Sequence, residues 1–241
     1  MYSGTAPYYD KIYQWKDYAG EVARILALLG EPSPSTSNST RGALLDVACG
    51  TGAHLEHFSE HFRVEGLDLC PELLEVARAR LPGVPLHAGD MLSFALGRTF
   101  DIVTCLFSAI GYVGTIDGLH RAIERMGAHV TPGGALVIEP WFTPDEFRAN
   151  SAHLLTIDEP ELKIARVNTS TRNGRVSVMD LHHLIGTPEE TVHIVEHHEL
   201  TLFEPEEMVA AFEASGFQVE IDEEGLTGRG LYYGRKESHH R

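Results

Sequence analysis

The sequence has no long apolar run and no recognisable leader. No stretch of about 18 consecutive apolar residues occurs, which is the length that a membrane-spanning helix needs. The N-terminus also lacks the basic, apolar and small-residue regions that make up a secretory signal. We therefore expect a cytoplasmic protein that does not enter a membrane.

Cysteine and basic residues are both scarce. The three cysteines, Cys49, Cys70 and Cys105, form no Cys-x-x-Cys pair and are too few for a disulfide framework, so we expect reduced thiols without a zinc or redox role. Lysine and arginine number 19 against 35 aspartates and glutamates, which gives a formal net charge of −16. A surface of this charge disfavours nucleic acid as a partner. A ligand that carries phosphate would need a local group of arginines acting against the overall field.

The 14 histidines do not show metal-ligand spacing. His54, His57 and His61 share one side of a predicted helix, but the apolar residues of that helix predict that this side faces solvent. The adjacent histidines at 182–183 and 197–198 lie in predicted strands, where neighbouring side chains point to opposite faces. We therefore predict no metal site, although the faces of these strands could contact a substrate.

From residue 43 to about residue 140, short apolar runs alternate with helical stretches. This alternation predicts βαβ units and a parallel sheet. The predicted strands are 43–48, 64–69, 84–88, 101–107 and 135–139. Pro71 suits the first position of one helix and Gly83 follows its end, while Asp117 is predicted to cap another helix that stops before Pro132. The central part of the chain therefore belongs to the α/β class.

The two ends of the chain differ from this central part. Residues 1–30 contain an arm rich in aromatic residues and a predicted helix over 18–29, followed by a polar loop over 31–41. After residue 140, three strand-like segments follow one another without helices, at 162–171, 175–185 and 191–203. Asn173-Gly174 is a hairpin signal, because both residues tolerate a positive φ. We predict one domain with an antiparallel lid over 141–203, closed by a helix over 205–216 and strands at 218–222 and 230–235.

A glycine-rich turn follows the first predicted strand. Gly50-Thr51-Gly52 allows the backbone to approach a ligand closely, at the sheet edge where open α/β folds bind nucleotides. A dinucleotide site would have a third glycine three residues after Gly52, but Leu55 is the apolar residue found there instead. A nicotinamide oxidoreductase is therefore disfavoured.

Acidic residues stand at the ends of three successive predicted strands. Asp46 precedes the glycine turn and could accept hydrogen bonds from an ammonium group. Asp68 follows 22 residues later, where a carboxylate can bind ribose hydroxyls. Asp90, after the third strand, could meet an adenine amino group, with Met91 against the ring. This pattern resembles the S-adenosylmethionine (SAM)-dependent methyltransferase superfamily over residues 43–140 and the closing strands.

The superfamily resemblance implies a seven-stranded Rossmann-like sheet with a reversed last strand and helices on both faces. It implies SAM as the cofactor and S-adenosylhomocysteine (SAH) as its product, with no metal. The candidate cofactor-binding residues are Tyr13, Asp46, Ala48, Gly50, Gly52, Asp68, Leu69, Asp90, Met91 and Leu106.

A closer resemblance covers nearly the whole chain. It rests on Tyr9-Asp10 with Tyr13, Lys16-Asp17-Tyr18, Asp46 to Gly52, Thr104 to Gly111, Glu139-Pro140-Trp141-Phe142, Thr201-Leu202-Phe203 and Gly228-Arg229-Gly230-Leu231. These segments resemble the N,N-dimethyltransferases of desosamine and mycaminose biosynthesis, which methylate the 3-amino group of a dTDP-linked sugar. The resemblance implies that Tyr13 helps to close the SAM pocket and that Arg229 binds the diphosphate.

One position departs from that family. Where the family has a histidine near the reacting amine, after a Ser-x-Ile-Gly turn, this chain has Tyr112. Tyr112 and Tyr13 are the catalytic candidates, and the departure leaves the acceptor open. The candidates for acceptor binding are Ser108, Trp141, Arg166, His182 and Arg229, and Arg172 and Arg175 could join an anion site.

The predicted reaction is the transfer of a methyl group from SAM to the amine of a small acceptor, with a dTDP-linked amino sugar as the first candidate. Alignment of the acceptor with the activated methyl group would supply most of the rate, so a general base is not essential. Two alternatives stay open: a methyltransferase of another small metabolite, such as a glycine-like amine or a natural-product intermediate, and a non-catalytic SAM-binding module. The sequence does not determine the oligomeric state, and a homodimer is one of the states open to it.

Overall fold

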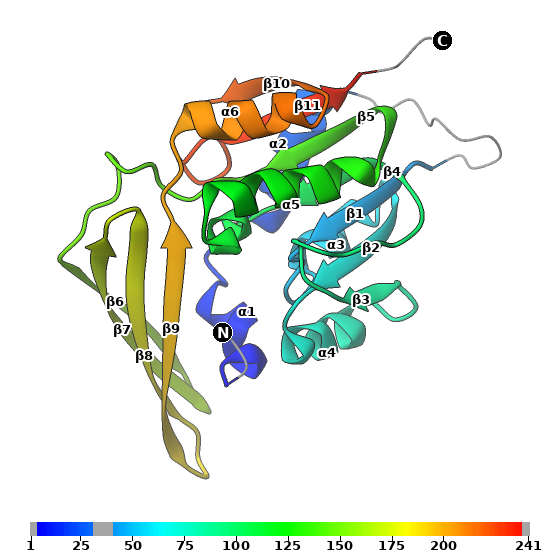
Figure 1. Cartoon of the computed structure of the whole chain (residues 1–241). Helices are drawn as coiled ribbons and strands as arrows, with labels where there is room; N and C mark the ends of the chain where they lie inside the picture. Colours follow the sequence, from blue (N-terminus) through cyan, green and yellow to red (C-terminus); the bar gives the residue numbers. More distant parts are fainter. Residues whose placement is uncertain (1–3, 31–40, 238–241) are drawn as a thin grey trace.

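The computed structural model describes residues 4–30 and 41–237, which form a seven-stranded sheet with helices and a separate four-stranded sheet (Figure 1). Apart from Arg41, the polar loop predicted at 31–41 lies outside the described residues. Within the described ranges, no helix is long and apolar enough to span a membrane.

The order of the elements confirms the α/β prediction. The helices are η1 (Ala6–Tyr8), α1 (Tyr9–Ile12), α2 (Tyr18–Leu29), α3 (Ala53–Phe58), α4 (Pro71–Arg80), η2 (Ala109–Val113), α5 (Ile116–Ala128) and α6 (Pro205–Ala214), where η marks a 3₁₀ helix. The strands of the larger sheet are β1 (Ala43–Val47), β2 (Arg63–Asp68), β3 (Leu86–Ala88), β4 (Phe100–Cys105), β5 (Val130–Ile138), β10 (Phe217–Asp222) and β11 (Leu231–Lys236).

The larger sheet has the strand order β10-β11-β5-β4-β1-β2-β3. Strands β5, β4, β1, β2 and β3 pair in parallel, whereas β11 runs antiparallel to both β5 and β10. The expected seven-stranded sheet with a reversed last strand is therefore confirmed. Because β1 and β2 lie beside β4 and β3 in parallel, their carboxyl ends meet at one edge of the sheet.

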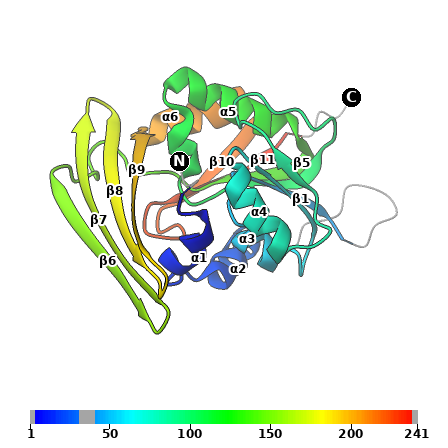
Figure 2. The ribbon, with the colours of Figure 1, turned by 90° about the horizontal axis from the view of Figure 1, so that it is seen from below.

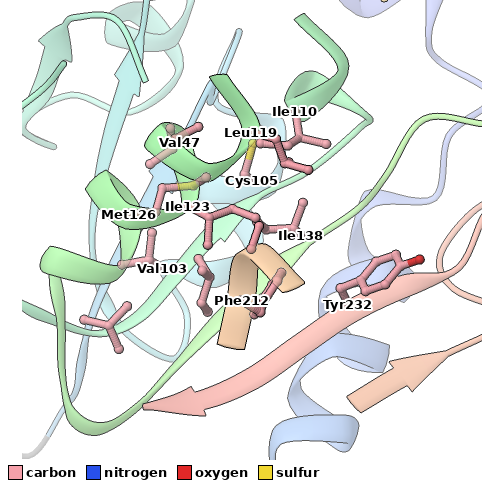
Figure 3. Close-up of a cluster of buried hydrophobic side chains, with 14 of the residues drawn as sticks. Val47, Val103, Cys105, Ile110, Leu119, Ile123, Met126, Ile138, Phe212 and Tyr232 are labelled. Atoms are coloured by element: carbon pink, nitrogen blue, oxygen red, sulfur yellow. The ribbon is translucent and has the colours of Figure 1, made fainter. Parts of the chain in front are cut away.

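Helices cover both faces of this sheet. On one face, α5 and α6 pack against β1, β4 and β5, and Figure 3 shows Leu119, Ile123 and Met126 of α5 in one cluster with Val103 and Ile138. These α5 residues recur at helical spacing, which gives the helix its apolar stripe. On the other face, α2, α3 and α4 bury a second cluster. The three cysteines are free thiols, and all three are buried.

The start of α5 differs from the prediction. Thr115 is the N-cap residue, and its hydroxyl accepts a hydrogen bond of 2.9 Å from the backbone N–H of Gly118. Asp117, which was predicted to cap the helix, lies in the first turn instead, where a carboxylate interacts favourably with the helix dipole. Both residue types cap helices well, so the sequence pattern alone placed the boundary two residues too late.

The lid is a four-stranded antiparallel sheet, β6 (Ser151–Glu159), β7 (Leu162–Asn173), β8 (Val176–Gly186) and β9 (Thr191–Thr201), in that order. The hairpin expected at Asn173-Gly174 joins β7 to β8, with Gly174 at φ 58°. Strand β6 was not predicted, because Ile157 is its one buried residue and its apolar side chains do not alternate.

The N-terminal arm lies between the two sheets (Figure 2). Ile12 of α1 packs against Ile157, Ile164 and Ile185 on the inner face of the lid, while Tyr9 packs against the first turn of α4 through Leu73. The arm therefore joins the lid to the carboxyl edge of the larger sheet.

Candidate active site

The glycine turn after β1 has a backbone that few side chains tolerate. Ala48, Gly50 and Gly52 have φ values of 60°, 56° and 76°, all in the left-handed region. The carboxylate of Asp68 holds this turn, because Oδ2 accepts 2.7 Å from the N–H of Gly50 and Oδ1 accepts 2.8 Å from the N–H of Cys70. The carboxyl end of β2 thus fixes the loop after β1.

A cavity of about 190 Å³ opens at this edge of the sheet. The predicted cofactor residues that line it are Ala48, Gly50, Asp68, Leu69, Asp90, Met91 and Leu106. Tyr9, Phe107 and Tyr112 line it as well. Asp90 is oriented locally, because its Oδ1 accepts 2.8 Å from the N–H of Leu92. The cavity combines a mostly apolar wall with carboxylates from two strand ends, which suits an adenosine group.

Asp46 faces a smaller adjoining cavity, which Gly50 and His54 also line. Its side chain is 2% exposed, and its Oδ1 accepts 2.7 Å from the hydroxyl of Thr104. Burial raises the pKa of Asp46 from 3.8 to about 6. A buried carboxylate with a raised pKa is stabilised by a neighbouring cation, so this position fits an ammonium group.

The loop after β4 is strained and firmly held. Phe107 and Ser108 have φ values of 52° and 63°, which are unusual for residues other than glycine. The N–H of Phe107 donates 2.6 Å to Glu139, and the hydroxyl of Ser108 donates 2.7 Å to the carbonyl of Pro140. These bonds orient η2, which carries Tyr112, toward the cavity. Ser108 is buried against the backbone of the β5 end.

The arm is clamped onto the glycine turn. Asp10 accepts 2.7 Å from the hydroxyl of Thr51 and 2.5 Å from Nη2 of Arg80. Tyr13 does not line the larger cavity itself; its ring lies 4.7 Å from that of Tyr9 and 5.1 Å edge-on from that of Phe107, between centroids. The arm therefore covers the site from the lid side.

Arg166 reaches this arm from the inner face of the lid. Its Nη1 donates 3.4 Å to the hydroxyl of Tyr13, and its guanidinium lies 5.7 Å from the centre of that ring. Arg172 and Arg175 are engaged elsewhere: Arg172 donates to the carbonyls of Pro144 and Gly174, and Arg175 pairs with Glu207. Of the three arginines considered for an anion site, Arg166 is the one that faces the arm.

A buried network of Lys16, Glu21 and His54 lies beside the smaller cavity, which His54 lines, and the position of His54 differs from the prediction. His54 was predicted to face solvent, but its side chain is buried and its Nε2 lies 2.7 Å from Glu21. Glu21 also pairs with the fully buried ammonium group of Lys16. Burial opposes ionisation of Glu21, but the bonds from His54 and Lys16 outweigh it and lower the pKa. Because α3 packs on α2, its first turn faces this carboxylate rather than water.

Arg229 lies at a third cavity, of about 640 Å³, which Trp15, Lys16 and Arg24 also line. Its guanidinium carbon lies 5.3 Å from the ring centre of Trp141 and 5.4 Å from that of Phe142. One nitrogen is 3.3 Å from Glu139, whereas Nε is buried and has no hydrogen-bond partner among residues 4–30 and 41–237. The Nε1 of Trp141 donates 2.9 Å to Ser177, which fixes that ring against the lid.

The predicted site residues that line none of these cavities are Tyr13, Gly52, Ser108, Trp141, Arg166 and His182. His182 is on the outer face of the lid, where its ring stacks on His193 at 5.3 Å. Gly52 lines neither cavity at the turn; it packs against the end of α4, where a Cβ would lie 3.0 Å from Leu81, the residue after the helix. Across the part of the chain that the structure describes, no group of three or more potential ligands is arranged to hold a metal ion.

The lid contributes polar residues that the sequence reasoning missed. His198 lies on the inner face, 1% exposed, with Nδ1 2.7 Å from the hydroxyl of Tyr112. Glu196 lies two residues before His198 in β9 and therefore on the same face of the strand. The period of two in β9 could have revealed both, because Val192, Ile194 and Leu200 are the apolar residues of that face.

A glycine turn, successive acidic strand ends and the seven-stranded sheet define a class I SAM-dependent methyltransferase. The family described as a methyltransferase domain matches residues 44–134. The chain is 42% identical to a dTDP-3-amino-3,6-dideoxy-alpha-D-glucopyranose N,N-dimethyltransferase of Streptomyces fradiae, covering 97% of this chain and 91% of that protein. It therefore belongs to the family of dTDP-amino-sugar N,N-dimethyltransferases, and SAM is its cofactor.

Solved structures agree with this assignment. The crystal structure of DesVI from Streptomyces venezuelae has a TM-score of 0.88 at 40% identity, covering 96% of this chain and 98% of that one. CalS10 with bound SAM, an amino pentose methyltransferase from Micromonospora echinaspora involved in calicheamicin biosynthesis, has a TM-score of 0.83 at 42% identity, with 95% and 96% covered. These matches include the lid as well as the larger sheet.

Proposed function

We propose that this chain transfers methyl groups from SAM to the 3-amino group of a dTDP-linked deoxysugar and carries the amine to the dimethyl state. The observation that supports a nucleotide-linked acceptor is Arg229. Its side chain is 13% exposed and lies at a cavity of about 640 Å³, and its buried Nε has no hydrogen-bond partner among the described residues. Such an arginine can donate hydrogen bonds to an anion, although the net charge of the chain is −16. Arginine binds phosphate oxygens through bidentate hydrogen bonds.

The cofactor roles follow from the strand ends. Asp46 accepts hydrogen bonds from the ammonium group of SAM, Asp68 holds the ribose, and Asp90 with Met91 binds the adenine. The reactive methyl group of SAM is already activated by its sulfonium, so the protein's main contribution is alignment of the acceptor. Tyr13 and Tyr9 keep the arm closed over the bound cofactor.

The acceptor site lies on the lid side of the arm. Arg166 binds an anionic part of the acceptor near Tyr13, and Trp141 supplies an aromatic face beside Arg229. His182 has no such role, because its exposed ring stacks on the outer face. The 3-amino position is preferred over a 4-amino position because relatives acting on 3-amino sugars share 42% and 41% identity, against 38% for one acting on a 4-amino sugar.

The test is incubation of purified protein with SAM and dTDP-3-amino sugars, with products followed by mass spectrometry. We expect mono- and then dimethylated product. Calorimetric titration of dTDP into the SAH complex should show binding, and Arg229→Met should weaken it about 10- to 100-fold, the loss of one charged hydrogen-bonding group.

Arg172→Met is the matched control, because Arg172 also donates to backbone carbonyls at the lid but lies away from the Arg229 cavity. Two results together would refute the proposal of a nucleotide-sugar acceptor. The first is turnover of an amine that carries no nucleotide; the second is a wild-type protein that does not bind dTDP, or an Arg229→Met variant that binds dTDP as tightly as the wild type. SAH binding without product from any acceptor would instead support a non-catalytic SAM-binding module.

A further inference from the structure

A chain of polar side chains leads from the cofactor cavity into the buried face of the lid. Tyr112 lines the cavity of about 190 Å³, and its hydroxyl lies 2.7 Å from Nδ1 of His198. His198 is 1% exposed, so its ring has no contact with bulk water. Tyr112 lies on η2, which follows β4 of the larger sheet, whereas His198 lies on β9 of the lid. The contact between them therefore joins the larger sheet's loops to the lid.

Glu196 extends this chain on the far side of His198. Its Oε2 lies 3.6 Å from Nε2 of His198 and 3.4 Å from Nε2 of His183 on β8, and its Oε1 accepts 2.6 Å from the hydroxyl of Thr5. Burial alone would raise the pKa of Glu196, but the two histidines and the threonine lower it to about 2. Glu196 is therefore a carboxylate at neutral pH.

This arrangement selects one tautomer of His198. A carboxylate beside Nε2 favours the proton on that nitrogen, which leaves Nδ1 as an acceptor for the hydroxyl of Tyr112. The order of groups, a hydroxyl, an imidazole and a carboxylate, has the same logic as a catalytic triad, in which the carboxylate orients the imidazole and stabilises its protonated form. Here the hydroxyl is the phenol of Tyr112, a residue that lines the cavity.

We propose that Tyr112, His198 and Glu196 form a proton relay that deprotonates the acceptor amine at the wall of the cofactor cavity. This inference rests on the proposed function, because it needs an amine acceptor. Tyr112 is the catalytic residue that touches the amine. His198 receives the proton through Tyr112, and Glu196 positions His198 and stabilises its charge.

The relay solves a problem of protonation. Amines with pKa values near 8 to 10 are mostly protonated at neutral pH, and an ammonium nitrogen has no lone pair with which to attack. The ammonium proton moves to Oη of Tyr112 as the phenolic proton moves to Nδ1 of His198. The neutral nitrogen then forms a bond to the methyl carbon while the carbon–sulfur bond breaks and its electron pair stays on sulfur.

The first test compares kcat across pH for Tyr112→Phe and His198→Gln. Each variant should lose about 100-fold in kcat at pH 7, the lower end of what general base catalysis contributes. The loss should shrink to less than about tenfold at high pH, where the amine gives its proton to solvent. A loss that is the same at every pH, or no loss at all, would overturn the relay.

The matched control is His197→Gln. His197 is the neighbour of His198 in β9, but it points to the outer face and pairs with Asp180 and Glu199. This variant should keep the wild-type pH profile. A second comparison is Tyr112→His. This variant should exceed Tyr112→Phe in activity and should no longer depend on His198, since an imidazole accepts a proton by itself. Continued dependence on His198 would contradict the proposal.

A spectroscopic readout tests the relay without turnover. In the SAH complex labelled with ¹⁵N-histidine, His198 should be the Nε2–H tautomer, and its Nδ1 resonance should shift in Tyr112→Phe and stay unchanged in His197→Gln. The opposite tautomer would refute the relay. Failure of the proposed function is a separate result: the wild-type protein would then give no methylated amino sugar, whereas failure of the relay leaves wild-type turnover intact with variants that lose activity equally at all pH values.

Discussion

Replacing Asp46 with asparagine should stabilise the ligand-free protein and weaken its binding of SAM. Burial raises the pKa of Asp46 from 3.8 to about 6, so ionisation of this carboxylate in the folded state is unfavourable. A difference of about two pH units corresponds to about 3 kcal/mol. At neutral pH the empty site therefore carries a charge that destabilises the fold.

The sign of the pH dependence follows from proton binding. Because the folded-state pKa is the higher one, the folded protein holds the proton of Asp46 more tightly than the unfolded chain between pH 3.8 and about 6. The free energy of unfolding therefore falls as pH rises through this window and levels off above it. At pH 5 the cost of Asp46 is about half of its value at pH 7.

Asparagine keeps the shape of the side chain and can still accept the hydrogen bond from Thr104. Without ligand, Asp46→Asn should gain about 2 kcal/mol at pH 7, or about 4 to 8 °C in Tm for a chain of this size, and clearly less at pH 5. Calorimetric titration should show SAH binding about 10- to 100-fold weaker, because a charged hydrogen bond to the ammonium group is lost. A lower Tm of the ligand-free variant, together with unchanged SAH affinity, would refute this reasoning.

Three further substitutions test other contacts. Asp10→Asn removes the charged partner of the arm clamp, which is partly exposed, so SAH affinity should fall about fivefold by calorimetry, and an unchanged affinity would show that the clamp is not coupled to the cofactor. Glu21→Gln leaves the buried charge of Lys16 without its carboxylate and should lower the free energy of unfolding in urea by about 3 to 5 kcal/mol; a loss under 1 kcal/mol would contradict the buried pair. Gly66→Ala would place a Cβ 2.7 Å from the sulfur of Cys49 and should lower the free energy of unfolding by about 1 to 3 kcal/mol. Gly186→Ala is the control, because its Cβ would meet no atom closer than 3.5 Å and should leave the free energy of unfolding unchanged. Equal effects of the two variants would argue against the tight packing at Gly66.

Much of the fold could be predicted from the sequence because two local signals were strong. The alternation of buried strands with helices required a parallel sheet, and Asn173-Gly174 required a hairpin at one position of the lid. Strand β6 was missed because it is held by pairing with β7, not by a pattern of its own: Leu154 is 69% exposed and Ile157 is its one buried residue. A strand of this kind is defined by its neighbour.

The site was predictable where residues act through their place in the chain. Ala48, Gly50, Asp68 and Asp90 line one cavity because each stands at the carboxyl end of a parallel strand or shortly after it. His54 was misread because its partner, Glu21, lies on another helix. Contacts of this kind depend on which elements pack together, and helical spacing within one element does not carry that information.

The lid is an uninterrupted insertion between the end of β5 at Ile138 and the start of α6 at Pro205. Every residue that lines the cavity of about 190 Å³ lies before residue 114. The lid can therefore be exchanged for that of a related enzyme as a single cassette, leaving the cofactor cavity as it is. One residue outside the lid has to be exchanged with it. Because His198 of the lid contacts Tyr112 of the remaining chain, a transplanted lid also needs at position 112 the residue that pairs with its own β9.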